Sequence, residues 1–360
     1  MANWIVRIGA LNCFEFRSSD ATPASSQRHC AQCFGTSKMA DSIPVIDIGP
    51  LVQQKADPHM AEDPQVMNVV RQLDEACREI GFFYVKGHGV SPHLLEQVLD
   101  VGYKFFALPE EDKLQIAMSS DTGFRGYQKL GQNITKGQPD LHEAIDYFRE
   151  LENQKLSTRK ENPLMGSNQW PNEPSGFRPL IEEYVNVMTD LGEAIIQGIA
   201  LALSGKKDAF GGKRAGDPFW ILRVIGYPPM KKSDFEVGCG DHTDYGLLTL
   251  VNQDPTIPAL QVKNNEGNWI WAKPIPGTFV VNIGDMLKIW TNGLYQSTLH
   301  RVMNDDSKYR VSVPFFYEPN FDALVEPLEI CKQQTASAVP RFTPVVYGDH
   351  VIGKVLTNFG

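Results

Sequence analysis

Apolar residues along the chain change their spacing near residue 218. Before this point they recur at intervals of three and four residues, which is typical of amphipathic helices. This spacing predicts helices over 64–80, 93–107 and 176–204. Gly81 and Gly205 follow the first and the last of these stretches and predict where they end. A further short helix is predicted to start at 108–113, where acidic residues are favourable near a helix N-terminus.

After residue 218, short β-rich runs alternate with turn signals. The predicted strands are 220–227, 246–251, 260–263, 269–272, 278–283, 298–303 and 309–317, with two earlier ones at 43–48 and 82–85. Residues 265–268 have the composition of a hairpin turn. Many short strands favour a β sandwich or barrel. Separate α and β domains are the alternative, but no linker divides the two halves, so a barrel flanked by helices is preferred.

Composition and charge narrow the class of protein. The 360 residues are 42% hydrophobic and 21% charged, which is a globular balance. A net charge of -9 argues against a nucleic-acid partner, which requires clustered Lys and Arg. No apolar run approaches the roughly 20 residues that span a bilayer. Six scattered cysteines favour a reducing compartment. We therefore expect a cytoplasmic protein, and we predict a monomer.

Residues 1–41 differ from the rest, because they are rich in Ser, Ala, Thr and Gln and lack a periodic pattern. We predict a flexible N-terminal extension. A transit peptide is the alternative, although Glu15 and Asp20 do not fit its acid-poor composition. An upstream extension is a further alternative, because Met39 begins a stretch that looks like a natural protein start, Met-Ala-Asp-Ser-Ile-Pro. His29, Cys30 and Cys33 form one CxxC beside a histidine, but a structural zinc site needs four ligands and no second pair lies nearby.

His242 and Asp244 lie at the mouth of a predicted strand. Residues two apart in extended backbone point to the same side, so this imidazole and this carboxylate can reach one point. His300 lies on a later β run and can supply a third ligand. Two histidines and one carboxylate that leave other positions open are typical of non-haem iron(II) oxygenases. Zinc is the competing metal, but zinc hydrolases usually carry HExxH on a helix, and this motif does not occur in the sequence.

A second cluster follows on the next predicted strand, where Arg310 and Ser312 share one face. A guanidinium group binds a carboxylate through two parallel hydrogen bonds, and a neighbouring hydroxyl adds a third. The alternative is a solvated surface arginine, but apolar residues flank Arg310. We therefore predict a carboxylate-binding site one strand away from the metal.

Together, His242-Thr243-Asp244, His300 and Arg310-x-Ser312 resemble the 2-oxoglutarate- and iron(II)-dependent dioxygenases. They are most similar to the plant-type branch that includes isopenicillin N synthase and aminocyclopropane-carboxylate oxidase. Four further segments agree with this branch over about residues 42 to 360: Ile43-Pro-Val-Ile-Asp-Ile48, Gly81-Phe-Phe-Tyr-Val-Lys-Gly-His-Gly89, Tyr227-Pro-Pro229 and Val281-Asn-Ile-Gly-Asp285.

The resemblance implies a distorted double-stranded β-helix, or jelly roll, with flanking N-terminal and C-terminal helices. It divides one integrated domain into a helical and mixed part, 42–217, and a catalytic core with a C-terminal segment, 218–360. It assigns iron ligation to His242, Asp244 and His300. It also assigns the distal carboxylate of 2-oxoglutarate to Arg310 and Ser312, with help from Tyr227.

The resemblance also suggests substrate contacts. Phe316 matches a position that commonly lines the family's substrate pocket. Tyr127 and Arg125 are weaker candidates for substrate contact. The family often has Asn two residues before the Tyr227 position, where this chain has Ile225, so one polar contact is lost or replaced.

The roles of three further polar residues have more than one interpretation. A structural hydrogen bond is the preferred interpretation of His88, which lies in a Gly-His-Gly turn. His142 and Glu143 fit either the pocket entrance or an ordinary polar surface.

Three protein ligands leave about three positions on iron, of which 2-oxoglutarate takes two and O2 one. The implied reaction oxidises a small organic molecule, most simply by hydroxylation, and releases succinate and CO2. Ascorbate is a further candidate cofactor. Two alternatives remain open: an iron oxidase of the same branch that does not use 2-oxoglutarate, and a non-catalytic binding protein on the same fold. The sequence does not identify the substrate.

Overall fold

The computed structural model describes residues 42–151, 162–229, 237–304, 308–336 and 338–359. The predicted N-terminal extension, with its His29-Cys30 and Cys33, therefore lies outside the described residues. Residues 42–359 belong to one compact unit. Its α-helices are α1 (Gly49–Gln53), α2 (Pro64–Glu79), α3 (Pro92–Phe106), α4 (Glu110–Lys113), α5 (Phe177–Ser204), α6 (Asp285–Trp290), α7 (Glu329–Gln333) and α8 (Tyr347–Phe359). Two 3-10 helices, η1 (Met60–Glu62) and η2 (Leu114–Ile116), complete them.

Sixteen strands are present in the described part of the chain. They are β1 (Val45–Asp47), β2 (Phe82–Lys86), β3 (Gly126–Gln128), β4 (Ile134–Thr135), β5 (Gln138–Pro139), β6 (Glu143–Phe148), β7 (Trp220–Tyr227), β8 (Val237–His242), β9 (Leu248–Gln253), β10 (Leu260–Lys263), β11 (Trp269–Trp271), β12 (Phe279–Ile283), β13 (His300–Met303), β14 (Arg310–Tyr317), β15 (Leu324–Val325) and β16 (Val345–Val346).

Most strands form two sheets. The larger has the order β1-β2-β12-β9-β14-β7-β6-β3, and the smaller has the order β11-β10-β13-β8. Within these sheets only the β1–β2 pair is parallel. Strands from the first half of the chain, β1, β2, β3 and β6, extend both edges of the larger sheet, so the two halves share one framework. This antiparallel arrangement is the predicted jelly-roll core.

Strand β14 shows how alternation sorts side chains between the two faces of the larger sheet. Val311, Val313, Phe315 and Tyr317 are buried in the main hydrophobic cluster together with residues of α3 and α5. The intervening positions, among them Arg310, Ser312 and Phe316, face the opposite side. A smaller cluster on that side includes Tyr84, Tyr227 and Val302. The site residues thus lie on the inner face of the sheet.

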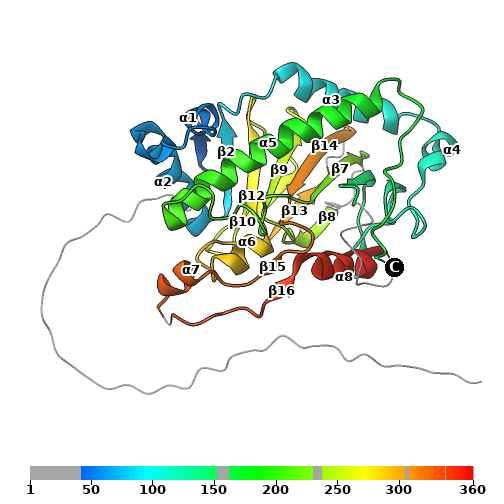
Figure 1. The fold of residues 1–360 in the computed structure, drawn as a ribbon. Helices are drawn as coiled ribbons and strands as arrows, with labels where there is room; N and C mark the ends of the chain where they lie inside the picture. Colours follow the sequence, from blue (N-terminus) through cyan, green and yellow to red (C-terminus); the bar gives the residue numbers. More distant parts are fainter. Residues whose placement is uncertain (1–41, 152–161, 230–236, 305–307, 337, 360) are drawn as a thin grey trace, which may run out of the picture. The chain divides into compact units, whose positions relative to one another are not determined.

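Helix α5 crosses the outer face of the larger sheet, where it packs against α2 and α3 and against β14 and β9 (Figure 1). By length and composition this helix could cross a membrane, but 61% of its most apolar window is buried inside the protein. Gly192 of α5 lies so close to β14 that an added Cβ atom would come 2.4 Å from the Tyr317 ring. Helix α5 is therefore the central packing helix of the folded unit.

The helices predicted over 64–80, 93–107 and 176–204 are confirmed as α2, α3 and α5, and the predicted strands are confirmed within two residues at most ends. The sequence did not predict β6 as a strand, nor did it give bounds for the C-terminal helices. Helix α8 proves to be one of the walls of the site described below.

Candidate functional site

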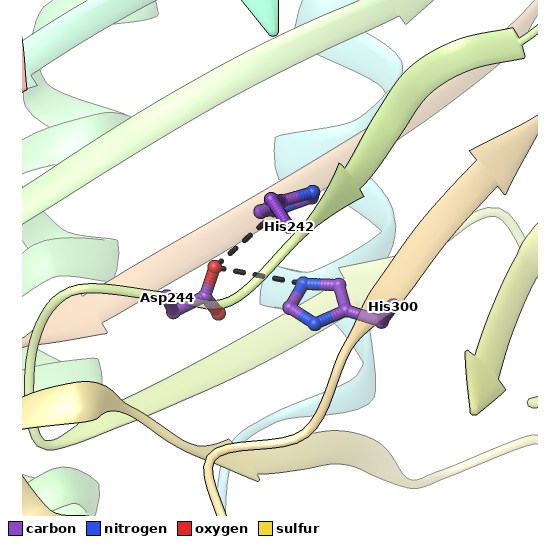
Figure 2. A group of neighbouring side chains, drawn as sticks. All are labelled: His242, Asp244 and His300. Atoms are coloured by element: carbon purple, nitrogen blue, oxygen red, sulfur yellow. Dashed lines mark ion pairs between the residues drawn. The ribbon is translucent and has the colours of Figure 1, made fainter. Parts of the chain in front are cut away.

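Three residues converge between the two sheets: His242 at the end of β8, Asp244 two residues later and His300 at the start of β13. His242 and His300 are paired across adjacent strands. Figure 2 shows the carboxylate of Asp244 facing both rings, with one oxygen joined to each by a dashed line. Asp244 Oδ1 lies 3.5 Å from Nε2 of each histidine, and one ligand atom from each residue lies within 4.8 Å of the others. Asp244 and His300 are buried, and His242 is partly exposed.

Backbone hydrogen bonds set which nitrogen of each ring is available. Nδ1 of His242 lies 2.7 Å from the Gly240 carbonyl oxygen, and Nδ1 of His300 lies 3.1 Å from the Thr298 carbonyl oxygen. A ring whose Nδ1–H donates to a carbonyl presents the lone pair of Nε2. Both Nε2 atoms face Asp244, so the donor set matches a metal site that accepts two imidazoles.

The carboxylate of Asp244 is also oriented. Asn282 of β12 donates to its Oδ2 at 2.7 Å, and the Thr249 hydroxyl of β9 donates to the same oxygen. Oδ1 therefore remains free to face the histidines as a monodentate ligand. Burial alone would raise the pKa of Asp244, but the histidines and the Asn282 hydrogen bond hold it well below its usual range. Asp244 is thus ionised at neutral pH.

Asp285 forms hydrogen bonds with the two segments that carry Asp244 and His300. Its backbone N–H donates to the Asp244 carbonyl at 2.8 Å. Its carboxylate accepts hydrogen bonds from Thr243 at 3.2 Å and from Ser297 at 2.6 Å. The segment after His242 and the segment before His300 are therefore fixed to one residue.

Arg310, Ser312 and Tyr227 form a second polar cluster on the inner face of the larger sheet. Arg310 and Tyr227 are paired across β14 and β7, and the Arg310 guanidinium lies 5.0 Å from the centre of the Tyr227 ring. Arg310 and Ser312 are buried. Nε and Nη1 of Arg310 have no hydrogen-bond partner among the described residues. Burial lowers the pKa of Arg310 from its ordinary value. A buried guanidinium with unpaired N–H groups fits an incoming carboxylate.

A cavity of about 670 Å³ opens beside the candidate metal-ligand cluster, which is His242, Asp244 and His300. His242, Asp244 and Phe316 line the cavity. Arg223, Asp146 and Glu318 bring charge to its walls, and residues 349–357 of α8 cover one side. Arg310, Ser312 and Tyr227 do not line this cavity. The cavity volume is within the range of small-molecule sites.

Arg125 and Tyr127 lie elsewhere. Arg125 is fully buried, and its guanidinium donates to the Leu164 carbonyl at 2.6 Å and the Gly123 carbonyl at 3.1 Å. The Tyr127 hydroxyl donates to Glu143 at 2.5 Å. Neither residue lines the cavity, so their placement does not support the predicted substrate contact.

Contacts in the structure also bear on the predicted roles of the remaining polar residues. His88 interacts with the Gly277 carbonyl at 3.1 Å and accepts from the Val90 N–H, in agreement with a structural role. His142 and Glu143 are both buried. Glu143 pairs with Lys113 at 2.7 Å, and His142 lies 2.8 Å from the Gly238 carbonyl. The surface interpretation of these two residues was wrong, and neither residue lines the cavity described above.

Sequence reasoning missed several residues that the fold brings to the site. Asn282 belongs to a motif that carried the resemblance, but nothing in the sequence showed that it binds the Asp244 carboxylate. Arg223 and Glu318 are further examples. The alternation that places Arg310, Ser312 and Phe316 on one face of β14 continues to Glu318, so this residue could have been found.

Two family models match the chain. Residues 43–173 match the N-terminal model described as non-haem dioxygenase in morphine synthesis, and residues 218–319 match the 2OG-Fe(II) oxygenase superfamily. Homoarginine-6-hydroxylase 2-ODD-233 of Oryza sativa subsp. japonica is 56% identical over 88% of this chain and 98% of its own length. Homoarginine-6-hydroxylase 2-ODD-C23 of Glycine max is 57% identical over 88% of this chain and 97% of its own length.

Solved structures agree with this result. A full-length Neurospora crassa protein, solved in complex with alpha-KG (2-oxoglutarate) and 5-formyluracil, has a TM-score of 0.75 and 26% identity, over 90% of this chain and 98% of that one. JOX2 in complex with 2OG, Fe and JA has a TM-score of 0.71 and 29% identity, over 88% of this chain and 87% of that one.

Proposed function

The chain belongs to the 2OG-Fe(II) oxygenase superfamily, and we propose that it hydroxylates homoarginine at carbon six. It is a 2-oxoglutarate-dependent dioxygenase that uses Fe(II) and O2 and acts on a small molecule. The observation that carries the choice of substrate is the similarity to four homoarginine-6-hydroxylases, which are 52–57% identical over 88% of this chain.

We assign the iron to His242, Asp244 and His300. The donor set supports this assignment, because the two Nε2 atoms and Oδ1 of Asp244 converge on one space while their other polar atoms are already bonded. Two nitrogens and one carboxylate oxygen suit Fe(II) and leave positions open for a chelating co-substrate. Asn282 and Thr249 keep the carboxylate in its orientation, as outer partners of metal ligands usually do.

We assign the distal carboxylate of 2-oxoglutarate to Arg310, Ser312 and Tyr227. The unpaired Nε and Nη1 atoms of Arg310 support this, because buried N–H groups without acceptors are costly and a carboxylate would satisfy them. When bound together, iron, 2-oxoglutarate and O2 supply the oxidising chemistry, and the co-substrate leaves as succinate and CO2. The protein's own part is to orient the two molecules and to limit access of water to them.

The cavity contains groups suited to an amino acid. Arg223 of β7 donates through Nε to Asp146 at 2.8 Å, while its Nη2 atom has no partner among the described residues. That free N–H group is suited to the carboxylate of an amino-acid substrate. Asp146 also accepts a hydrogen bond from Gln128 at 2.7 Å, so the carboxylate that orients Arg223 has a second donor of its own.

A substrate panel tests this proposal. The purified chain with Fe(II), 2-oxoglutarate and O2 is incubated with homoarginine, arginine, lysine and neutral amino acids, and succinate is measured against substrate consumed. We expect substrate-dependent succinate with homoarginine, in equal amount to the homoarginine lost. Succinate that forms with another member of the panel and not with homoarginine would overturn the substrate. Substrate loss and O2 uptake without succinate would overturn use of 2-oxoglutarate and favour the oxidase alternative.

The expected monomeric state and cytoplasmic location form a separate part of the proposal. Size-exclusion chromatography with light scattering tests the first, since a monomer has the chain mass of 40.2 kDa. Imaging of a C-terminally tagged full-length chain tests the second, and organelle import would favour the transit-peptide reading of residues 1–41.

A further inference from the structure

Glu318 is a buried carboxyl group that the proposed iron and 2-oxoglutarate sites do not use. It follows β14 directly, and its side chain lines the cavity beside the metal-ligand cluster. Only 1% of the residue is exposed. Burial of a carboxyl group at such a position is unfavourable unless a partner compensates for it.

The protein compensates for this burial only in part, through the Tyr347 hydroxyl. Oε2 of Glu318 makes no hydrogen bond of normal geometry with any residue that the structure describes, although the Tyr347 hydroxyl lies next to the carboxyl group. Gly246 provides the space: a Cβ atom at this position would lie 1.7 Å from Oε2 of Glu318. The backbone is thus shaped around a carboxyl group that has an unused acceptor.

The fold places this acceptor near the proposed iron. Gly246 is two residues after Asp244, and Thr249, which donates to Asp244, is paired with Phe316 across β9 and β14. Glu318 follows Phe316 on the same side of the chain, about 7 Å further along for two residues of extended backbone. Glu318 and Asp244 line the same cavity, and the charge of Asp244 acts on the Glu318 carboxyl group.

Two other carboxylates of the cavity, Asp146 and Asp241, are less suited to bind a cation. Asp146 is paired with Arg223, and Asp241 lies 3.8 Å from Arg301 with its side chain 41% exposed. A substrate guanidinium at Asp146 would have to compete with an internal arginine. Glu318 has no such competitor among the described residues.

We propose that Glu318 determines substrate specificity by binding the guanidinium group of the substrate. This inference rests on the proposed function, and it adds the residue that recognises the cation. In homoarginine the guanidinium nitrogen is attached to carbon six. A carboxylate that holds the guanidinium close to the iron therefore also brings carbon six to the reacting position, and one contact sets both selectivity and regiochemistry.

The electrostatics agree with this role. Burial raises the pKa of Glu318 to about 8, and the negative charge of Asp244 contributes to the increase, while Tyr347 opposes it. An incoming guanidinium would favour the ionised carboxylate and supply an opposite charge. A neutral ligand of the same shape would not.

The test compares homoarginine with homocitrulline, in which an uncharged urea replaces the guanidinium group. Wild-type protein, Glu318→Gln and the matched control Glu326→Gln, which changes an exposed glutamate, are each loaded with Mn(II) and 2-oxoglutarate. Calorimetric titration gives the affinity for each amino acid, and kcat/KM is measured with Fe(II). Glutamine keeps the shape of the side chain, and thermal unfolding with co-substrate titration verifies that the variant is folded.

We expect Glu318→Gln to lose about 10- to 100-fold in affinity and kcat/KM for homoarginine, since one charge-assisted interaction is removed. Its affinity for homocitrulline should change by less than about threefold. The control should match the wild type with both ligands. Equal losses for both amino acids, or no loss for homoarginine, would overturn the role of Glu318 and leave the proposed function intact.

Failure of the proposed function gives a different result. If the wild type does not turn over homoarginine, binding of homoarginine to the Mn(II) protein still decides the role of Glu318. Binding that is lost in Glu318→Gln but kept in Glu326→Gln supports guanidinium recognition at this carboxylate. Absence of binding to the wild type overturns it.

Discussion

Replacement of Arg310 by methionine removes the guanidinium group and keeps most of the volume of the side chain. In the structure this group is buried, lies over the Tyr227 ring, and has two unpaired N–H positions. If 2-oxoglutarate accepts two charge-assisted hydrogen bonds there, each contributes about 1.5–3 kcal/mol. The variant should therefore lose at least about 3 kcal/mol of binding free energy, which is roughly a 150-fold weaker affinity.

The same variant should behave differently without co-substrate. Without co-substrate the Tyr227 ring compensates the buried guanidinium only in part, so removal of this group should leave the free energy of unfolding unchanged or higher. Calorimetric titration of 2-oxoglutarate into the Mn(II)-loaded protein measures the first effect, and urea unfolding measures the second. Arg149→Met is the control, because Arg149 pairs with Asp217 and does not line the cavity. An affinity of Arg310→Met within about threefold of the wild type would refute the assignment.

Three further predictions follow from other contacts. Asn282→Ala removes one of two donors to Asp244 and should weaken Fe(II) binding about 10- to 100-fold in an anaerobic metal titration, whereas unchanged affinity would contradict the orienting role. The pKa of Glu318 is about 8 in the folded protein against 4.5 ordinarily. Between these pH values the folded protein therefore keeps a proton that the unfolded chain has released. Stability of the metal-free wild type should therefore fall by at most about 1.4 kcal/mol per pH unit from pH 5 to 8, and Glu318→Gln should lack this loss in urea unfolding. Gly192→Ala should destabilise the protein by about 1–3 kcal/mol, because its Cβ would lie 2.4 Å from the Tyr317 ring, and a more stable variant in urea would show that α5 can shift.

The elements that the sequence predicted well are those with a regular pattern. Helices α2, α3 and α5 have apolar residues at helical spacing, and β14 alternates between two faces. The same alternation put Arg310 and Ser312 on one side of a strand. The HxD spacing predicted that His242 and Asp244 reach one point, although Asp244 lies two residues beyond the end of β8. Local periodicity was sufficient for these predictions because each depends on a few adjacent residues.

Contacts between distant segments could not be predicted in this way. Asn282 reaches Asp244 across the sheet, and the cavity wall of α8 comes from the end of the chain. The polar character of His142 and Glu143 suggested a surface position. Strand β6 begins at Glu143 and lies between β7 and β3, and both residues are buried. Their burial depends on Lys113 and the Gly238 carbonyl, partners that only the tertiary structure brings close.

The most direct test of the account follows the oxygen atoms. The protein, with Fe(II), 2-oxoglutarate and homoarginine, is exposed to isotopically labelled O2, and succinate is analysed by mass spectrometry. A 2-oxoglutarate-dependent dioxygenase transfers one atom of O2 to succinate, so we predict one labelled oxygen in each succinate formed and one succinate per homoarginine consumed. Loss of homoarginine with unlabelled succinate, or with no succinate at all, would contradict the account.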